Sequence, residues 1–213
     1  GHRAHDMVIH GADEDHGRGQ EPDRQCRHDV EHDDGERHEQ VHGRHDEQGW
    51  KVTLAETGAD DFTGARVKHV ERFIQDGPFL LTYGDGLANI DLNALVTFHR
   101  SHGRLASVTA VHPPARFGEL IVDGPQVGRF SEKPQVGSGL INGGVFVFEK
   151  RVFDYLSSDP TCALEHQPMA DLTRDGQLMA YEHDGFWQCA DTVREVTILR
   201  ELWESRKAPW HAW

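Results

Sequence analysis

The sequence predicts an α/β protein built on a mainly parallel sheet. Strand-forming and helix-forming segments alternate along the chain from residue 50 onward, which is typical of strands separated by crossover helices. A short, continuous apolar run at 79–81 leads into Tyr83-Gly84-Asp85-Gly86. Apolar runs that end in turn residues are typical of strands buried on both faces of a parallel sheet.

Each element follows from local signals. Asp91 is a favourable N-cap for a helix through His102, and Gly103 suits the position after its end. The turn signal at 123–125 predicts a hairpin, and β-forming residues place 141–148 at the centre of the sheet. We expect strands over 50–54, 79–83, 106–111, 119–122, 126–130, 141–148 and 178–182, a strand or edge ribbon over 66–73, and helices over 92–102, 152–156, 169–173 and 191–206.

Asp85 lies where a ligand is expected. In open α/β sheets, ligands bind just beyond the carboxyl ends of the strands, and Asp85 follows the 79–83 strand between Gly84 and Gly86. A carboxylate there can reach a metal ion while glycine backbone lies close to a phosphate. The alternative is that Asp85 only caps a turn that the glycines permit.

Residues 1–41 differ in composition from the rest. They contain no Leu, Phe, Tyr, Trp or Lys, so they cannot bury enough apolar surface to offset their chain entropy, and we expect them to be disordered or nearly so. Their composition resembles an out-of-frame reading of a GC-rich gene, joined to genuine sequence near Val41. The alternative is a metal-binding tail, in which His28 and His32 have the spacing of two ligands on one helix face.

Charge and cysteine content narrow the function classes. The formal net charge of −14 argues against nonspecific nucleic-acid binding, which depends on basic residues. Cys26, Cys162 and Cys189 show no paired spacing, which favours a reducing compartment, and we expect a cytoplasmic protein. No apolar stretch approaches the roughly 18 residues of a membrane span, so we expect no membrane partner.

Several short motifs follow one another in the second part of the chain. They are Tyr83-Gly84-Asp85-Gly86, Arg116-Phe117-Gly118, Phe130-Ser131-Glu132-Lys133-Pro134, Ile141-Asn142-Gly143-Gly144, Gly185-Phe186-Trp187-Gln188, Asp191-Thr192 and Lys207-Ala208-Pro209-Trp210. Each is weak alone, but in this order they closely resemble the glucose-1-phosphate cytidylyltransferases, bacterial members of the sugar nucleotidyltransferase family. The resemblance runs from about His42 to Trp213.

The resemblance implies a nucleotidyltransferase-like fold, a doubly wound sheet with a sugar-binding subdomain. It divides the chain into an unmatched segment, residues 1–41, and a truncated nucleotidyltransferase domain, residues 42–213. Family members open with a strand and a GGxGTRL loop, followed by a lysine in a PKP context, and neither motif occurs in this sequence. We therefore expect the N-terminal third of the family fold to be missing.

The resemblance also implies a reaction. An oxygen of glucose 1-phosphate attacks the α-phosphorus of CTP, which gives CDP-glucose and pyrophosphate, and Mg²⁺ suits this chemistry because it binds a few hard oxygens. By their match to the family, Asp85 and Asp191 are the metal carboxylates. Asp191 also opens a helix, where it is expected to serve as the N-cap.

The remaining site residues are assigned by the same resemblance. They are Lys133 and Arg66 as catalytic residues, Thr63, Arg66 and Gly84 for the nucleotide, and Glu132, Lys133, Asn142 and Gly143 for the sugar phosphate. Without the resemblance, Lys133 is an ordinary solvated lysine before a proline, and 63–66 is an ordinary surface loop. Phe186 and Trp187 either wall the sugar or belong to the core, and the core is favoured.

Two classes of function follow. The first is an enzyme acting on CTP and glucose 1-phosphate, in an oligomeric family that makes CDP-glucose for O-antigen and other polysaccharides. The second is a non-catalytic remnant with at most weak sugar-phosphate binding, which the missing GGxGTRL loop favours for this chain. A related uridylyl- or thymidylyltransferase is a further alternative, because no base-contacting residue is identified. Gln167 departs from the family, which commonly has glutamate there, and this would alter a contact to the sugar or the subdomain.

Overall fold

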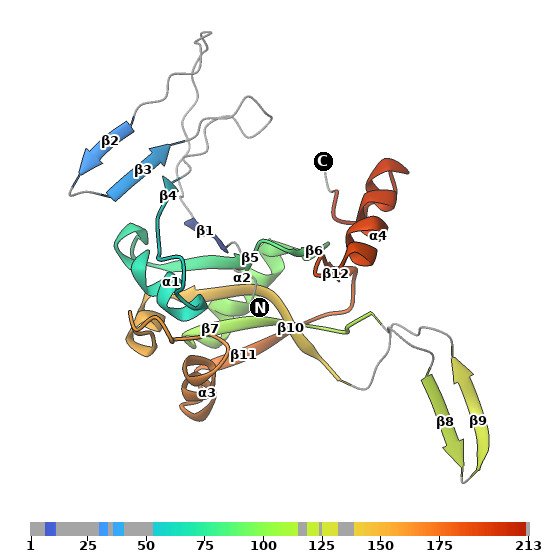
Figure 1. Cartoon of the computed structure of the whole chain (residues 1–213). Helices are drawn as coiled ribbons and strands as arrows, with labels where there is room; N and C mark the ends of the chain where they lie inside the picture. Colours follow the sequence, from blue (N-terminus) through green and yellow to red (C-terminus); the bar gives the residue numbers. More distant parts are fainter. Residues whose placement is uncertain are drawn as a thin grey trace.

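The structure is a computed structural model of the 213-residue chain. It describes residues 7–11, 30–33, 36–40, 53–114, 119–123, 125–131 and 139–211, with side chains in 53–114, 125–128 and 139–211. A five-stranded sheet with helices around it forms the main body (Figure 1). No helix within the described ranges is both long enough and apolar enough to cross a bilayer.

The strands of the main sheet lie in the order β1-β5-β10-β7-β11. Their bounds are β1 Met7–Gly11, β5 Pro78–Tyr83, β7 Ala106–Val111, β10 Ile141–Glu149 and β11 Leu178–His183. β10 lies at the centre, as its composition predicted, between β5 and β7. Both of these pairings are antiparallel, as is that of β1 with β5, whereas β7 and β11 are parallel.

The sheet is therefore mixed, and the predicted mainly parallel arrangement is wrong for the described strands. The apolar run in β5 correctly signals burial, because Phe79 and Leu81 are buried. Burial does not set strand direction, since a central antiparallel strand covered on both faces has the same composition as a parallel one. The antiparallel pairing of β5 with β10 was therefore not readable from the run at 79–81.

Three smaller sheets accompany the main one. They are β6 Gly86–Ala88 with β12 Trp187–Cys189, β2 Val30–Asp33 with β3 Glu36–Gln40 and β4 Thr53–Leu54, and β8 Glu119–Asp123 with β9 Gln126–Ser131. The β8–β9 pair confirms the predicted hairpin. β1, β2 and β3 fall within residues 1–41, whose side chains lie outside the description, so the prediction that this segment lacks a packed core stays a prediction.

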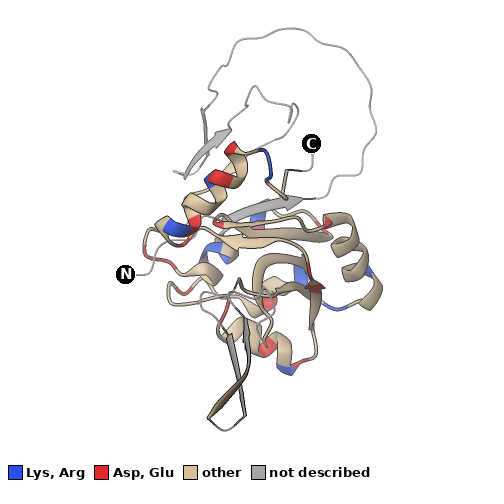
Figure 2. Ribbon diagram, turned by 90° about the vertical axis from the view of Figure 1, so that its right-hand side faces the viewer, with Lys and Arg blue, Asp and Glu red and all other residues tan. Residues whose placement is uncertain are grey.

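The described helical elements are α1 Thr63–His69, η1 Glu71–Phe73, α2 Leu92–His102, η2 Lys150–Tyr155, α3 Gln167–Arg174 and α4 Val193–Glu204. Among them, α2 and α4 begin at side-chain N-caps. α2 confirms its prediction closely: the Asp91 carboxylate accepts a hydrogen bond from the Ala94 amide at 3.0 Å, and Gly103 adopts the left-handed conformation with φ of 62°. Acidic and basic residues alternate along the α4 ribbon in Figure 2.

The strand or edge ribbon predicted over 66–73 is wrong, because α1 and η1 occupy this segment. Alternating Ala65 and Val67 fit a strand as well as a helix. Tertiary contacts decide in favour of the helix: the Ala65 amide donates to the carbonyl of Cys162 at 3.1 Å, and the Phe62 amide donates to that of Pro160 at 2.8 Å. These bonds dock the start of α1, and Ala65 and Val67 are buried.

A hydrophobic core fills one face of the sheet and is rich in phenylalanine. Phe79 and Phe153 stack with ring centroids 5.5 Å apart, and Phe146 and Phe148 stack at 5.3 Å. Close-packed rings of this kind contribute beyond their buried area. The buried members of the cluster are Val67, Phe79, Leu81, Ala106, Phe146, Phe148, Val152, Phe153, Leu156, Leu164 and Leu172.

A polar chain joins α2 to β7. The Arg104 amide donates to Nδ1 of His102 at 2.9 Å, so neutral His102 carries its proton on Nε2, which lies 2.7 Å from the Ser107 hydroxyl. That hydroxyl then donates to Nδ1 of buried His99 at 2.9 Å, which leaves the His99 proton on Nε2, 3.4 Å from a Glu149 oxygen. Burial, and next the charge of His102, lower the pKa of His99.

Candidate functional site

A short ribbon brings together the backbone segments that carry the two predicted metal carboxylates. β6 follows Asp85 directly and pairs antiparallel with β12, which precedes Asp191. The Ala190 amide donates to the Asp85 carbonyl at 2.8 Å, so the backbones that carry Asp85 and Asp191 lie side by side beyond the end of β5. That the two carboxylates share a metal ion stays a prediction.

Asp191 belongs to a cluster of potential metal ligands. One ligand atom each of Cys189, Asp191 and Glu195 lies within 4.8 Å of the others. Burial, followed by the charges of Asp191 and Glu195, raises the pKa of the Cys189 thiol to about 11. The thiol is therefore protonated near neutral pH, and the donors that remain are carboxylate oxygens. Such hard donors fit Mg²⁺, which binds through one or two carboxylates and keeps several waters.

The predicted N-cap role of Asp191 is wrong, because Thr192 caps α4. The Glu195 amide donates to the Thr192 hydroxyl at 3.3 Å, and the Thr192 amide donates to the Glu195 carboxylate at 2.9 Å. These reciprocal bonds form a capping box. The cap thus lies one residue further on, and it fixes the start of α4 directly after Asp191.

A bulge in β10 lies next to this ribbon. The register of β10 with β7 shifts between Asn142 and Phe146, and bulges often re-aim side chains next to functional sites. The Asn142 side-chain oxygen accepts from the Gly144 amide at 2.9 Å. Gly143 is packed so closely that an added Cβ would lie 2.7 Å from Val111 Cγ1. A side chain larger than that of glycine would therefore clash at position 143.

Trp187 contacts the bulge from β12. Its indole Nε1 donates to the Gly143 carbonyl at 2.8 Å. Phe186 lies beside it, with its amide donating to the Asn89 side chain at 2.7 Å and its ring 5.4 Å from that of Trp210. Both Phe186 and Trp187 are half-buried rather than core residues. The Trp187 bond joins the β6–β12 ribbon to the strand that carries Asn142.

Tyr83 and Glu165, to which the sequence assigned no role, lie next to the predicted site residues. The Tyr83 hydroxyl donates to the Glu165 carboxylate, and the Thr63 hydroxyl donates to the same carboxylate at 2.6 Å. The pKa of the Tyr83 phenol is raised by burial first and by the Glu165 carboxylate next. Tyr83 stands in the YGDG motif, which was a usable signal. Nothing in the local sequence distinguishes Glu165.

The Arg66 side chain contacts the loop before α1, and its predicted role at the nucleotide stays a prediction. Its guanidinium donates to the backbone carbonyls of Asp61 at 2.7 Å and Ala59 at 3.1 Å, so it closes the loop before α1. Thr63 joins the site only through Glu165, and Gly84 is exposed between Tyr83 and Asp85. Glu132, Lys133 and the motif at 116–118 lie outside the described residues.

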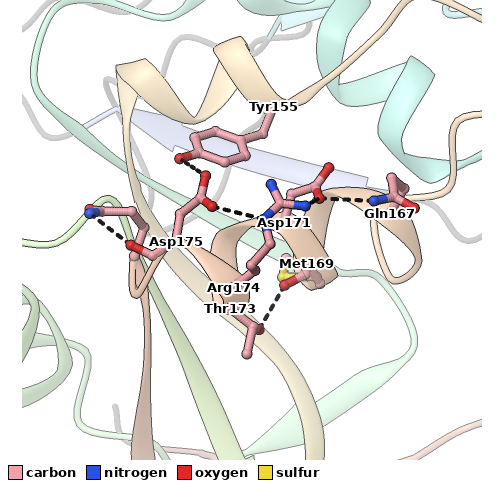
Figure 3. A network of polar contacts seen from close by, with 8 residues as sticks. Tyr155, Gln167, Met169, Asp171, Thr173, Arg174 and Asp175 are labelled. Carbon is pink, nitrogen blue, oxygen red and sulfur yellow. Dashed lines mark hydrogen bonds and ion pairs between the residues drawn. The ribbon is translucent and has the colours of Figure 1, made fainter.

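Gln167, the residue that departs from the family, forms a hydrogen bond within α3. Its side-chain amide donates to Asp171 at 2.8 Å, and Asp171 also accepts from Arg174 (Figure 3). A glutamate at 167 would place like charges at i and i+4 on this helix, which is destabilising. The change from the family residue is therefore consistent with the partner that this chain carries at 171.

The fold is that of a nucleotidyl transferase. The nucleotidyl transferase family matches residues 31–189, and the chain belongs to this family.

Similar proteins within this family carry names that include a sugar phosphate as substrate. The chain is 46% identical to the glucose-1-phosphate cytidylyltransferase of Salmonella typhi over 165 residues, which is 77% of this chain and 64% of that protein. It is 41% identical to the probable glucose-1-phosphate cytidylyltransferase of Bacillus subtilis (strain 168) over 164 residues, with the same coverage of 77% and 64%. The chain thus spans 64% of the length of each of these relatives, slightly less than two-thirds.

Solved structures share the fold at low sequence identity. A putative glucose-1-phosphate thymidylyltransferase from Bacillus anthracis aligns with a TM-score of 0.52 at 18% identity, covering 68% of this chain and 62% of that one. A UDP-glucose pyrophosphorylase aligns with a TM-score of 0.52 at 13% identity, covering 70% of this chain and 64% of that one. The predicted nucleotidyltransferase-like α/β fold is confirmed.

Proposed function

We propose that this protein transfers a cytidylyl group from CTP to glucose 1-phosphate. A phosphate oxygen of the sugar phosphate forms a bond to the α-phosphorus of CTP, the bond to the β-phosphate oxygen breaks, and pyrophosphate leaves. The observation that carries the proposal is the β6–β12 ribbon, which sets Asp85 beside Asp191 at the strand end next to the Asn142–Gly143 bulge. The names of the cytidylyltransferase relatives support the choice of substrates.

In this proposal, Asp85 and Asp191 hold Mg²⁺. When bound, the ion would offset the negative charge of the phosphates, which is the main requirement in phosphoryl-type transfer. The protein residues orient the two substrates. Asn142 and the Gly143 backbone contact the sugar from the bulge. Lys133, which the resemblance places on the sugar phosphate, would neutralise it as a point charge.

The test compares two aspartates that differ in their proposed roles. Asp85→Asn removes a proposed metal ligand, and we expect pyrophosphate release from CTP and glucose 1-phosphate to fall by roughly 100-fold or more. Asp91→Asn is the matched control: it removes one carboxylate charge nearby but keeps a side chain that caps α2 equally well. Equal rates for the wild type and Asp85→Asn would contradict the proposed site. Faster turnover with UTP or dTTP than with CTP would contradict the choice of nucleotide.

A second candidate function is sugar-phosphate binding without turnover. The observation that favours it is that no GGxGTRL motif occurs in these 213 residues, and such a loop presents backbone amides to phosphates. Calorimetry with glucose 1-phosphate and Mg²⁺, run beside the pyrophosphate assay on the same protein, separates the two functions. Binding without pyrophosphate release supports the second, and restoration of turnover by a version that carries the loop would show that the loop is what turnover requires.

A further inference from the structure

Asn89 closes the β6–β12 ribbon at the end opposite Asp85. In the register of the ribbon, Trp187 pairs with Ala88, so Asn89 and Phe186 form the next pair. The Asn89 amide donates to the Phe186 carbonyl at 3.2 Å. In return, the Phe186 amide donates to the Asn89 side-chain oxygen at 2.7 Å. The Asn89 side chain thus takes the place that a backbone carbonyl has in a hydrogen-bonded antiparallel pair.

The surroundings of Asn89 accommodate this contact. The chain leaves the ribbon directly after Asn89, since Asp91 already caps α2. A side-chain acceptor keeps the Phe186 amide paired at the point where the ribbon ends. Gly185 leaves the space that this acceptor needs, because an added Cβ there would lie 2.4 Å from the Asn89 side-chain oxygen. The exposed Asn89 side chain is therefore held at a defined place.

The other end of the same ribbon carries the candidate metal carboxylates. There the Ala190 amide donates to the Asp85 carbonyl at 2.8 Å, and Asp191 follows Ala190. Three residue pairs lie between the two ends. A two-stranded ribbon is marginally stable by itself, and a slip of one residue would turn every side chain of a strand to the opposite face. The contacts that close the ends of the ribbon therefore determine its register.

We propose that Asn89 is a positioning residue for the metal carboxylates. Its two bonds to Phe186 set the register in which Asp191 follows the backbone partner of Asp85. This inference rests on the metal site of the proposed function. It assigns a role in that site to a side chain that lies at the far end of the ribbon from the carboxylates.

Two other contacts fasten the turn at Phe186 to the main sheet. His183, in β11, has its Nε2 3.2 Å from the Phe186 carbonyl. Trp187 donates from its indole to the Gly143 carbonyl in β10 at 2.8 Å. Asn89 differs from both because it lies on the opposing side of the ribbon and binds the amide as well as the carbonyl of Phe186. A two-point contact across the ribbon is the kind that fixes register.

A purely structural role for Asn89 gives a different result. If the residue only added stability, its loss would lower the free energy of unfolding and leave metal binding by the folded protein unchanged. Because Asn89 is exposed, water can replace its hydrogen bond, and the contribution to stability is small. A positioning role weakens metal binding with little change in unfolding, and a residue that restores the side-chain oxygen reverses the effect.

The experiment measures the binding of Mn²⁺ to the 213-residue chain by electron paramagnetic resonance, since Mn²⁺ favours the same carboxylate donors as Mg²⁺. For Asn89→Ala we expect about a tenfold weaker Mn²⁺ complex, at the low end of the effect of residues that orient metal ligands. Asn89→Asp keeps the side-chain oxygen, so it should recover most of the loss. Asn93→Ala, which replaces an exposed asparagine in the first turn of α2, is the matched control and should bind as the wild type does.

Amide exchange of Ala190 gives a readout that needs no metal. Its bond to Asp85 lies at the opposite end of the ribbon from Asn89. If Asn89 sets the register, this exchange should accelerate in Asn89→Ala and stay unchanged in Asn93→Ala, with the same free energy of unfolding in both. Unchanged Ala190 exchange, unchanged Mn²⁺ affinity, or a loss of affinity only in step with lost stability would overturn the proposal.

The same measurements separate this inference from the proposed function. If the wild type binds Mn²⁺ but releases no pyrophosphate from CTP and glucose 1-phosphate, the proposed function fails and the positioning role of Asn89 stands. If the wild type binds no Mn²⁺, the metal site fails and the positioning role fails with it. If Asn89→Ala does not fold, Gly185→Ala decides both measurements, because its new Cβ would displace the Asn89 side-chain oxygen.

Discussion

Replacing Gly144 by alanine introduces two unfavourable effects at the bulge in β10. Gly144 has a φ of +77°, a left-handed conformation that costs an L-residue about 1–2 kcal/mol. The new Cβ would also lie 2.9 Å from Cδ2 of Tyr83, and overpacking of this kind costs about 1–3 kcal/mol. We expect Gly144→Ala to lower the free energy of unfolding by about 2–5 kcal/mol, the sum of the two effects.

Gly103→Ala separates the two effects. Gly103 ends α2 with a φ of +62°, and an added Cβ there meets no atom within 4 Å. This variant therefore has only the conformational cost, about 1–2 kcal/mol. Urea unfolding of both variants, followed by circular dichroism, gives the steric contribution of the Tyr83 ring as their difference. Equal destabilisation of the two would refute the close packing of Tyr83 against the bulge.

Three further predictions concern folding. Burial lowers the pKa of His99 below its ordinary value of 6.5, so the unfolded chain takes up this proton first on acidification. The stability that His99 contributes is present above about pH 6.5 and is lost as the pH falls through the folded pKa; thermal midpoints from pH 8 to 5 should fall more steeply in the wild type than in His99→Asn. Thr192→Ala should lower stability by about 1 kcal/mol through loss of the capping box, whereas Thr197→Ala, on the same helix, should change it little, and equal losses would contradict the capping role. Phe148→Ala should cost about 3–5 kcal/mol in urea unfolding, and a loss below about 1 kcal/mol would show that its site is not close-packed.

Elements with strong local signals were predictable. α2 begins after Asp91 and ends before Gly103 because a side-chain cap and a left-handed glycine act within one turn of the chain. The 106–111 strand and the hairpin at 119–131 likewise depend on nearby residues. Because local chemistry determines such boundaries, they can be predicted without knowing which residues distant in sequence pack nearby.

Elements that depend on distant partners were not predictable. The α1 segment becomes helical because its backbone docks on carbonyls at 160 and 162, about a hundred residues away. The direction of β5 depends on β10 in the same way. Alternation of small apolar residues fits both a strand and a short helix, so the sequence around Ala65 and Val67 left the choice to tertiary contacts.

The same difference between local signals and distant contacts applies to the residues of the candidate site. Asp85 could be singled out because it follows a buried strand, and the ribbon brings the backbone of Asp191 next to it. The contacts of Arg66 with the carbonyls of Asp61 and Ala59 could not be predicted, because they depend on a loop shape that no motif encodes. The contacts of Glu165 could not be predicted because its two hydroxyl partners lie far away in sequence.

A series of aromatic contacts connects the buried core with the candidate site. Phe79 contacts Phe148 with centroids 5.8 Å apart, Phe148 stacks on Phe146 at 5.3 Å, and Phe146 contacts Tyr83 at 5.6 Å. Rings in a close-packed interior have little freedom to move, so each contact limits the next ring in the series. Asp85 lies two residues beyond the last of these rings, in the short turn between β5 and β6 rather than on a long loop. Because β5 and β6 hold both ends of this turn, and sites supported by rigid elements hold their geometry best, a change deep in the core is expected to reach the carboxylate through Tyr83.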